Sequence, residues 1–149
     1  MSLERDIRQS KFKNEFEKVT LNILFTNSWI NAFQLKWLKP FGISPQQYNV
    51  LRILRGNYPN SYKLAEITDR MIDKNSNATR LVEKLRSKNL LIRTINPENR
   101  RQVEIIITLH GLELLERIDK DENWFLANFE SISEKEAETL NQLLEKFRS

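Results

Sequence analysis

The chain has 149 residues, 40% of them hydrophobic, which suits one well-formed domain or a small domain with an extension, and its lack of cysteine excludes disulfides, thiolate metal sites and thiol redox switches. No apolar run is long enough for a signal peptide or a membrane span, so we expect a cytoplasmic protein with no membrane partner. The net charge of +4 divides into +3 for residues 1–40, +6 for residues 41–109 and −5 for residues 110–149, which favours a phosphate-binding middle over ordinary surface charge.

Residues 10–39 are predicted to form one long helix, because apolar side chains recur at helical spacing until Pro40 and Gly42. At 1.5 Å per residue this helix would be about 45 Å long, more than a compact small domain requires. Leu24 and Trp29 add apolar surface on other faces. We therefore expect this helix to contact a second subunit as well as its own chain.

Two shorter helices are predicted next. Ser44 can cap the first, which runs to about residue 55, with Pro45 at its first position and Gln47 completing a capping box. Breaker residues 56–60 end it. Ser61 is then expected to cap a short helix over residues 62–70.

A basic amphipathic helix follows the tight connection at residues 71–74. Its expected cap is Asp73 or Asn75, and it is expected to end near Asn89, a residue type that tolerates the left-handed conformation. Two short helices joined by a tight turn, the second basic and polar on one face, form a helix-turn-helix pattern. A plain helical hairpin is the alternative.

Residues 90–95 and 102–107 have strand character, and residues 96–101 form a turn that carries two adjacent arginines. A helix-turn-helix followed by such a hairpin is a winged helix. Thr108 is then expected to cap a helix over residues 109–129, and Ser133 with Glu136 to open a last helix.

These elements predict a fold class that is mainly α with a small β-hairpin wing (α+β). We expect a single chain-wide unit over residues 1–149. Within it, residues 41–109 form the winged helix-turn-helix lobe, and residues 10–39 and 109–149 form a helical dimerisation layer.

Five segments, in this order and spacing, resemble motifs of the multiple antibiotic resistance regulator (MarR) family of bacterial transcription factors. They look like the opening of the family's second helix, its recognition helix, and the start, tip and exit of its wing, at residues 41–47, 76–85, 89–93, 99–101 and 108–111. The resemblance implies a homodimer that binds a roughly palindromic operator. It also implies release by a small, frequently phenolic, ligand between the winged lobe and the dimer layer.

The chain departs from the family pattern at two positions. Asn89 stands where the family has the glycine that ends the recognition helix, which is a mild change. Asn99 stands where the wing usually has aspartate, which removes a carboxylate that could brace a neighbouring arginine. We therefore expect the wing arginines to be held less rigidly than in the family pattern.

The start of the second helix of a helix-turn-helix enters the major groove. The candidates for contacts to base edges are therefore Asn75, Ser76, Asn77, Thr79 and Arg80. Phosphate contacts are expected from Lys84 and, at the start of the preceding short helix, from Ser61, Tyr62 and Lys63. Arg100 and Arg101 at the wing tip suit the minor groove, whereas Arg93 could either contact DNA or form a structural ion pair.

An aromatic effector pocket could be walled by Trp29, Phe33, Trp37 and Tyr48, although aromatic residues at helical spacing more often form plain core. An enzyme is not predicted. The single histidine, His110, lies at a helix start, and the sequence has no Gly-rich phosphate loop, nucleophile motif or metal-ligand cluster, so we expect no catalytic site, metal or cofactor.

The predicted function is a sequence-specific, DNA-binding transcriptional regulator, a homodimeric repressor released by a small ligand. The alternative is a winged-helix protein-interaction module that does not read DNA. Steep salt dependence of binding to duplex DNA would separate the two.

Overall fold

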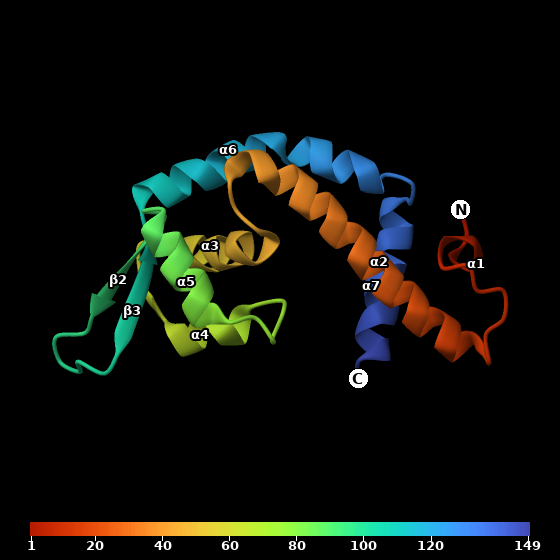
Figure 1. Ribbon diagram of the computed structural model, residues 1–149, viewed down its shortest axis with the longest axis horizontal. Helices are drawn as coiled ribbons and strands as arrows, with labels where there is room; N and C mark the ends of the chain where they lie inside the picture. The colour runs from red at the N-terminus through yellow and green to blue at the C-terminus, as the bar shows by residue number, and fades with distance from the viewer.

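The computed structural model describes the backbone of residues 1–149 and every side chain except those of residues 122–125. The chain is mainly helical with one small antiparallel sheet (Figure 1). Its elements, in order, are α1 (Leu3–Asp6), α2 (Glu15–Leu38), the 3-10 helix η1 (Lys39–Phe41), α3 (Pro45–Asn57), β1 (Tyr62–Lys63), α4 (Leu64–Arg70), α5 (Ala78–Ser87), β2 (Leu91–Ile95), β3 (Val103–Ile107), α6 (Leu109–Leu126), η2 (Ala127–Phe129) and α7 (Glu134–Phe147). Within the described part of the chain, no helix is long and apolar enough to cross a membrane.

The long helix α2 begins at Glu15 and not at Ser10, so the predicted start is wrong. Asn14 sets the observed start, because its side-chain oxygen accepts a hydrogen bond from Glu17 N at 2.9 Å. The end is close to the prediction: α2 passes into η1, and Gly42 follows with a φ of +72°.

The residues before α2 are tied to it through the short helix α1. Lys18 Nζ of α2 donates a hydrogen bond to Glu4 Oε1 of α1 at 2.6 Å. This contact is the main reason that the pKa of Glu4 falls to about 2. Leu3, next to Glu4 in the chain, is buried. The ion pair and this buried side chain together hold the N-terminal segment in place.

Three predicted helix boundaries are confirmed. Ser44 and Gln47 form a reciprocal capping box at α3, with distances of 3.1 Å and 3.0 Å, and Ser133 and Glu136 form another at α7. Asn89 follows α5 with a φ of +59°, the left-handed conformation that ends a helix.

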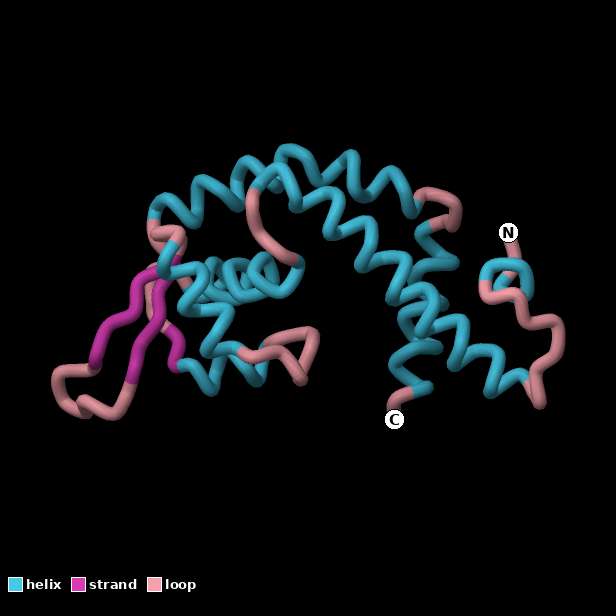
Figure 2. The backbone as a smooth tube through the Cα atoms, in the orientation of Figure 1, coloured by secondary structure: helices cyan, strands magenta, loops and turns pink.

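The predicted helix over residues 62–70 is wrong in its first two residues. Tyr62 and Lys63 form the strand β1, which pairs antiparallel with β3 in the register Tyr62↔Ile105 and Lys63↔Glu104. Lys63 has extended backbone and caps the helix: its N–H donates a hydrogen bond to Glu66 Oε2 at 2.8 Å, so α4 begins only at Leu64. The sheet order is β1-β3-β2, and β2 and β3 form the predicted wing (Figure 2).

The structure confirms the predicted winged helix-turn-helix, and the hydrophobic core is built around it and extends into α6 and the end of α2. Helices α3, α4, α5 and α6 contribute its most deeply buried side chains, among them Leu51, Leu54, Ile67, Leu85, Leu115 and Ile118. Trp37 and Leu38, at the end of α2, join this core. Arg55 of α3 and Asp119 of α6 form an ion pair at 2.7 Å over its surface.

Apolar side chains are exposed along much of α2 and along α7. Their larger exposed side chains include Phe16, Leu24, Leu140, Leu143 and Phe147, at 77%, 60%, 48%, 59% and 50% exposure. Helix α7 and the first half of α2 lie on the side of the molecule opposite the wing (Figure 1). A single chain therefore leaves this helical layer uncovered.

Candidate nucleic-acid interface

Helix α5 buries one side and exposes a polar, basic side. The buried residues are Ala78, Val82 and Leu85, and the exposed polar residues include Thr79, Arg80 and Lys84. Neither Arg80 nor Lys84 forms an ion pair with a carboxylate among the described side chains. Both cations are therefore available to an external anion.

The cap of α5 differs from the predicted Asp73 or Asn75. The side-chain oxygen of Asn77 accepts a hydrogen bond from Arg80 N at 3.1 Å, so Asn77 is the cap. Its oxygen is occupied by this bond, and the other end of its amide is the part that an external group can reach.

The residues just before the cap form a tight turn. Asp73 Oδ1 accepts a hydrogen bond from Asn75 N at 2.9 Å, and Asp73 O accepts one from Ser76 N at 3.2 Å. Asn75 is exposed. The hydroxyl oxygen of Ser76 is buried and has no hydrogen-bond partner among the described residues, so the turn presents Asn75 rather than Ser76 to the outside.

A hollow of about 410 Å³ lies between the start of α3 and the exposed side of α5. Ser44, Gln46 and Gln47 line it from α3, and Asn77, Arg80 and Lys84 are among its residues from the other side. Because two unpaired cations open onto it, this hollow extends the basic face of α5 towards α3. No motif in the sequence indicated that Ser44 and Gln46 would lie here.

The wing carries its two tip arginines on an ordered turn. Strands β2 and β3 pair from Leu91↔Ile107 to Ile95↔Val103. Asn99 Oδ1 accepts a hydrogen bond from Arg101 N at 3.2 Å, so Asn99 still organises the tip without a carboxylate. Arg100 and Arg101 are exposed, and neither has an ion-pair partner among the described side chains.

Arg93 forms a structural ion pair at the junction of wing and helix. Its Nη1 lies 2.6 Å from Glu83 Oε1, and Arg86 Nη2 lies 2.9 Å from Glu83 Oε2. Hydrogen bonds from Arg93 and then Arg86 lower the pKa of Glu83. In the free protein, Glu83 therefore holds both arginines along the surface and joins α5 to β2.

The predicted phosphate contacts at residues 61–63 lie on a strand and the loop before it. Tyr62 stacks under Arg70, whose Cζ lies 4.4 Å from the ring centroid, and the backbone oxygen of Ser61 accepts a hydrogen bond from Asn57. Lys63 remains exposed. Of these three residues, Lys63 offers the charge best suited to phosphate.

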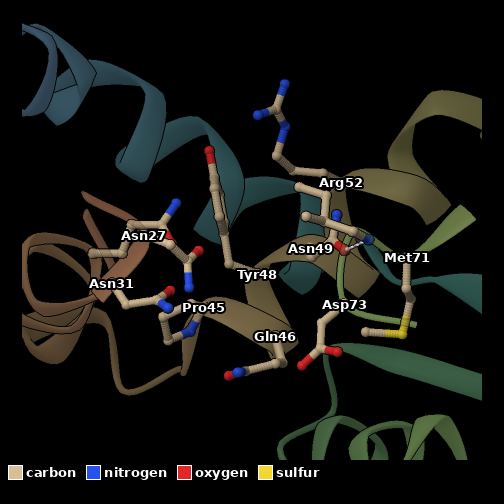
Figure 3. A pocket seen from close by; sticks show the side chains of 11 residues that line it. Asn27, Asn31, Pro45, Gln46, Tyr48, Asn49, Arg52, Met71 and Asp73 are labelled. Atoms are coloured by element: carbon tan, nitrogen blue, oxygen red, sulfur yellow. Dashed lines mark hydrogen bonds between the residues drawn. The ribbon is translucent and has the colours of Figure 1, made fainter. Parts of the chain in front are cut away.

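A pocket of about 420 Å³ separates α2 from α3 and the loop that leads to α5 (Figure 3). Most of the residues that line it are of polar types: Asn27, Asn31 and Gln34 come from α2, Pro45, Gln46, Tyr48, Asn49 and Arg52 from α3, and Met71, Ile72 and Asp73 from the loop. The Arg52 guanidinium lies 5.7 Å from the centroid of the Tyr48 ring. The pocket therefore offers amides, one aromatic ring and a cation to a small ligand.

The four aromatic residues proposed from the sequence do not share this pocket. Tyr48 lines it, and Trp37 packs edge-on against Tyr48 at 5.5 Å between centroids. Trp29 and Phe33 lie 4.6 Å apart and pack instead with Phe129. The amides that line the pocket carry no sequence signal, because their segments are far apart along the chain.

Comparison with known proteins gives consistent matches. A model of the MarR family matches residues 43–103. The HTH-type transcriptional regulator MhqR of Bacillus subtilis (strain 168) is 32% identical over 120 residues, which cover 78% of this chain and 80% of that protein. A MarR mutant from E. coli, solved in complex with operator DNA, has a TM-score of 0.80 at 23% identity and covers 93% of this chain and 99% of its own. Bordetella bronchiseptica BpsR, solved in a study of how 6-hydroxynicotinic acid regulates its DNA binding, has a TM-score of 0.78 at 19% identity, covering 89% of this chain and 100% of its own.

Proposed function

The chain belongs to the MarR family of transcriptional regulators, and from this premise we propose that it is a homodimeric repressor that binds a pseudo-palindromic operator and is released by a small ligand. The observation that carries the proposal is that Arg80 and Lys84 on α5, and Arg100 and Arg101 at the wing tip, are exposed and have no ion-pair partner among the described side chains. A helix and a wing with these charges match the major and minor grooves of one DNA face.

The residues divide between reading bases and holding the backbone. Arg80 can pair with guanine, and Asn75 can pair with adenine. Thr79 and Asn77 are also exposed at the start of the helix. Among the remaining candidates, we assign phosphate to Lys63 and Lys84, and the minor groove with its flanking phosphates to Arg100 and Arg101. We leave Ser76 out of the proposed base-reading set because its hydroxyl oxygen is buried in the free protein.

A second copy of the chain is the proposed cover for the exposed apolar layer. Leu24 and Phe16 on α2, with Leu143 and Phe147 on α7, are at least half exposed in the single chain. Residues 10–39 and 109–149 would then form the dimerisation layer, and residues 41–109 the DNA-binding lobe. A two-fold axis between the copies would place the two α5 helices about one turn of DNA apart.

The pocket between α2 and α3 is the proposed effector site. It lies where α2, which belongs to the dimerisation layer, meets α3 of the DNA-binding lobe. A ligand there would contact both parts at once and so favour one arrangement of the two over another. Its Tyr48 ring and Arg52 cation suit a small aromatic molecule that carries a polar or anionic group.

The proposed role is binding and not catalysis, as for the family's other regulators. Because such a regulator acts on chromosomal DNA, we place it in the cytoplasm.

Fluorescence anisotropy tests the DNA-binding proposal. An operator selected from a random duplex pool and a scrambled duplex would each be titrated at two salt concentrations. We expect tighter binding to the operator and a steep loss of affinity for both duplexes at the higher salt. Weak binding that hardly depends on salt would instead indicate a protein-interaction module.

Sedimentation tests the dimer proposal separately. At micromolar concentration we expect a species of twice the chain mass. A monomer at that concentration would contradict the proposed dimerisation layer.

A further inference from the structure

The loop between α4 and α5, residues 71–77, is attached to α3 inside the effector pocket. Asn49, in the middle of α3, accepts a hydrogen bond through Oδ1 from Ile72 N at 3.0 Å (Figure 3). Met71 is 1% exposed and Ile72 is 86% exposed, so the chain leaves the core within one residue at this bond. The Asn49 contact therefore fixes where the loop departs from α3.

From this bond, a short series of contacts leads to the helix that faces DNA. Asp73, directly after Ile72, accepts hydrogen bonds from Asn75 N and Ser76 N. Asn77 follows at once and caps α5. Because each contact spans only two or three residues, a shift at Ile72 moves the cap of α5 and the side chains of its first turn.

The effector pocket and the hollow beside α5 share part of one wall. Gln46 and Asp73 line both. Asn49 lines the pocket on one side of this wall, and Arg80 and Lys84 line the hollow on the other. Gln46 and Asp73 therefore border both the pocket and the hollow on the basic face of α5.

We propose that Asn49 is a positioning residue for DNA reading: it holds the α4–α5 loop, and through that loop the first turn of α5, from within the effector pocket. The inference rests on the proposed function and adds how a ligand in the pocket would weaken operator binding. A ligand that takes the Asn49 amide as its own hydrogen-bond partner removes the acceptor from Ile72 N. The first turn of α5 then loses its fixed position, whereas the phosphate-binding cations stay in place.

A pair of variants separates this role from that of the pocket lining as a whole. Asn49→Leu removes the acceptor and keeps the branching and number of heavy atoms of the side chain, and Asn31→Leu makes the same change on the α2 wall of the same pocket. Asn31 makes no hydrogen bond to the loop among the described contacts. Each variant is measured as the full-length protein, by amide hydrogen exchange at Ile72 and by anisotropy on the selected operator and the scrambled duplex.

We expect Asn49→Leu to speed exchange at Ile72 and to lower the operator-to-scrambled affinity ratio by roughly two- to thirtyfold, the range found for residues that couple sites without touching either ligand. The salt slope should not change, because every side chain that binds phosphate is still present. Asn31→Leu should leave exchange at Ile72 at the wild-type rate, because the Asn31 amide makes no hydrogen bond to the loop among the described contacts. Wild-type exchange and an unchanged affinity ratio in Asn49→Leu would overturn the proposal.

A measurement on the wild type covers the case in which Asn49→Leu does not fold. Exchange at Ile72 should be slower with bound operator than with bound scrambled duplex, and equal exchange would overturn the proposal. If the wild type prefers no operator at all, the proposed function fails and this inference fails with it. A wild type that reads an operator without added protection at Ile72 refutes the Asn49 role alone.

Discussion

Replacing Gly111 with alanine should destabilise the winged lobe. Gly111 lies in the first turn of α6, where an added Cβ would lie 2.3 Å from Leu90 O and 2.7 Å from Ile107 Cγ1. The Leu90 carbonyl is not free to move, because it accepts a hydrogen bond from Thr108 N at 3.1 Å. The helix and the start of β2 must therefore separate.

The size of the effect follows from these contacts. Overpacking of this kind costs about 1–3 kcal/mol, and loosening the hydrogen bond to Leu90 O adds about 1 kcal/mol. Alanine gains up to about 1 kcal/mol over glycine in a helix. We therefore expect a net loss of about 1–3 kcal/mol in the free energy of unfolding.

Gly56→Ala is the matched control. Gly56 lies near the end of α3, and an added Cβ there meets nothing within 4 Å. The control should stabilise the protein by about 0.4–1 kcal/mol. Urea denaturation followed by circular dichroism, at one protein concentration because dimers unfold in a concentration-dependent way, measures both variants. A Gly111→Ala midpoint at or above that of the wild type would refute the argument.

Three further predictions concern the DNA-binding residues and the ion pairs that join α5 to the wing. Arg80→Ala should weaken operator binding by about 1–3 kcal/mol and relax the sequence preference at one position per half-site, whereas equal losses on operator and scrambled duplex would exclude base reading. Arg101→Ala should lower the salt slope of binding by about one unit for each phosphate that the arginine neutralises, and an unchanged slope would show that Arg101 does not bind phosphate. Glu83→Gln should lower the free energy of unfolding most above pH 4.5. Arg93 and Arg86 hold the pKa of Glu83 below its ordinary 4.5 in the folded protein. The ion pairs of Glu83 therefore stabilise the fold fully above that pH, and this stabilisation is lost as the pH falls through the lowered pKa. Urea titrations across pH 3–7 check this, and a difference that stays constant with pH would contradict it.

The helix caps made from neighbouring residues could be predicted because their chemistry is local. Ser44 and Gln47 satisfy each other's backbone groups within one turn, and so do Ser133 and Glu136. Asn89 is predictable for a similar reason, since a single residue supplies the left-handed conformation.

The wrong boundaries arose where several local solutions compete. Asp73, Asn75 and Asn77 are all good caps, and burial of Ala78 in the core selects Asn77 as the residue at the helix start. Residues 62–63 pair with β3, which is about forty residues away, and a two-residue strand has no periodicity that reveals its partner. Tertiary contacts decided both cases.

The pocket was the least predictable feature. Its walls come from α2, α3 and the loop before α5, and its polar residues are amides that carry no motif. An aromatic stripe was the only visible signal, and it led to Trp29 and Phe33, which pack with Phe129 instead.

The wall shared by the pocket and the hollow beside α5 affects how much ligand is needed to release the protein from each operator. Because coupling between two sites is reciprocal, a ligand that weakens operator binding is itself bound less tightly by the operator-bound protein, by the same factor. A tightly bound operator would then release the protein only at a high ligand concentration, and a weakly bound operator would release it at a lower one. One regulator with one effector would in this way switch its genes on in sequence, ordered by the strength of their operators.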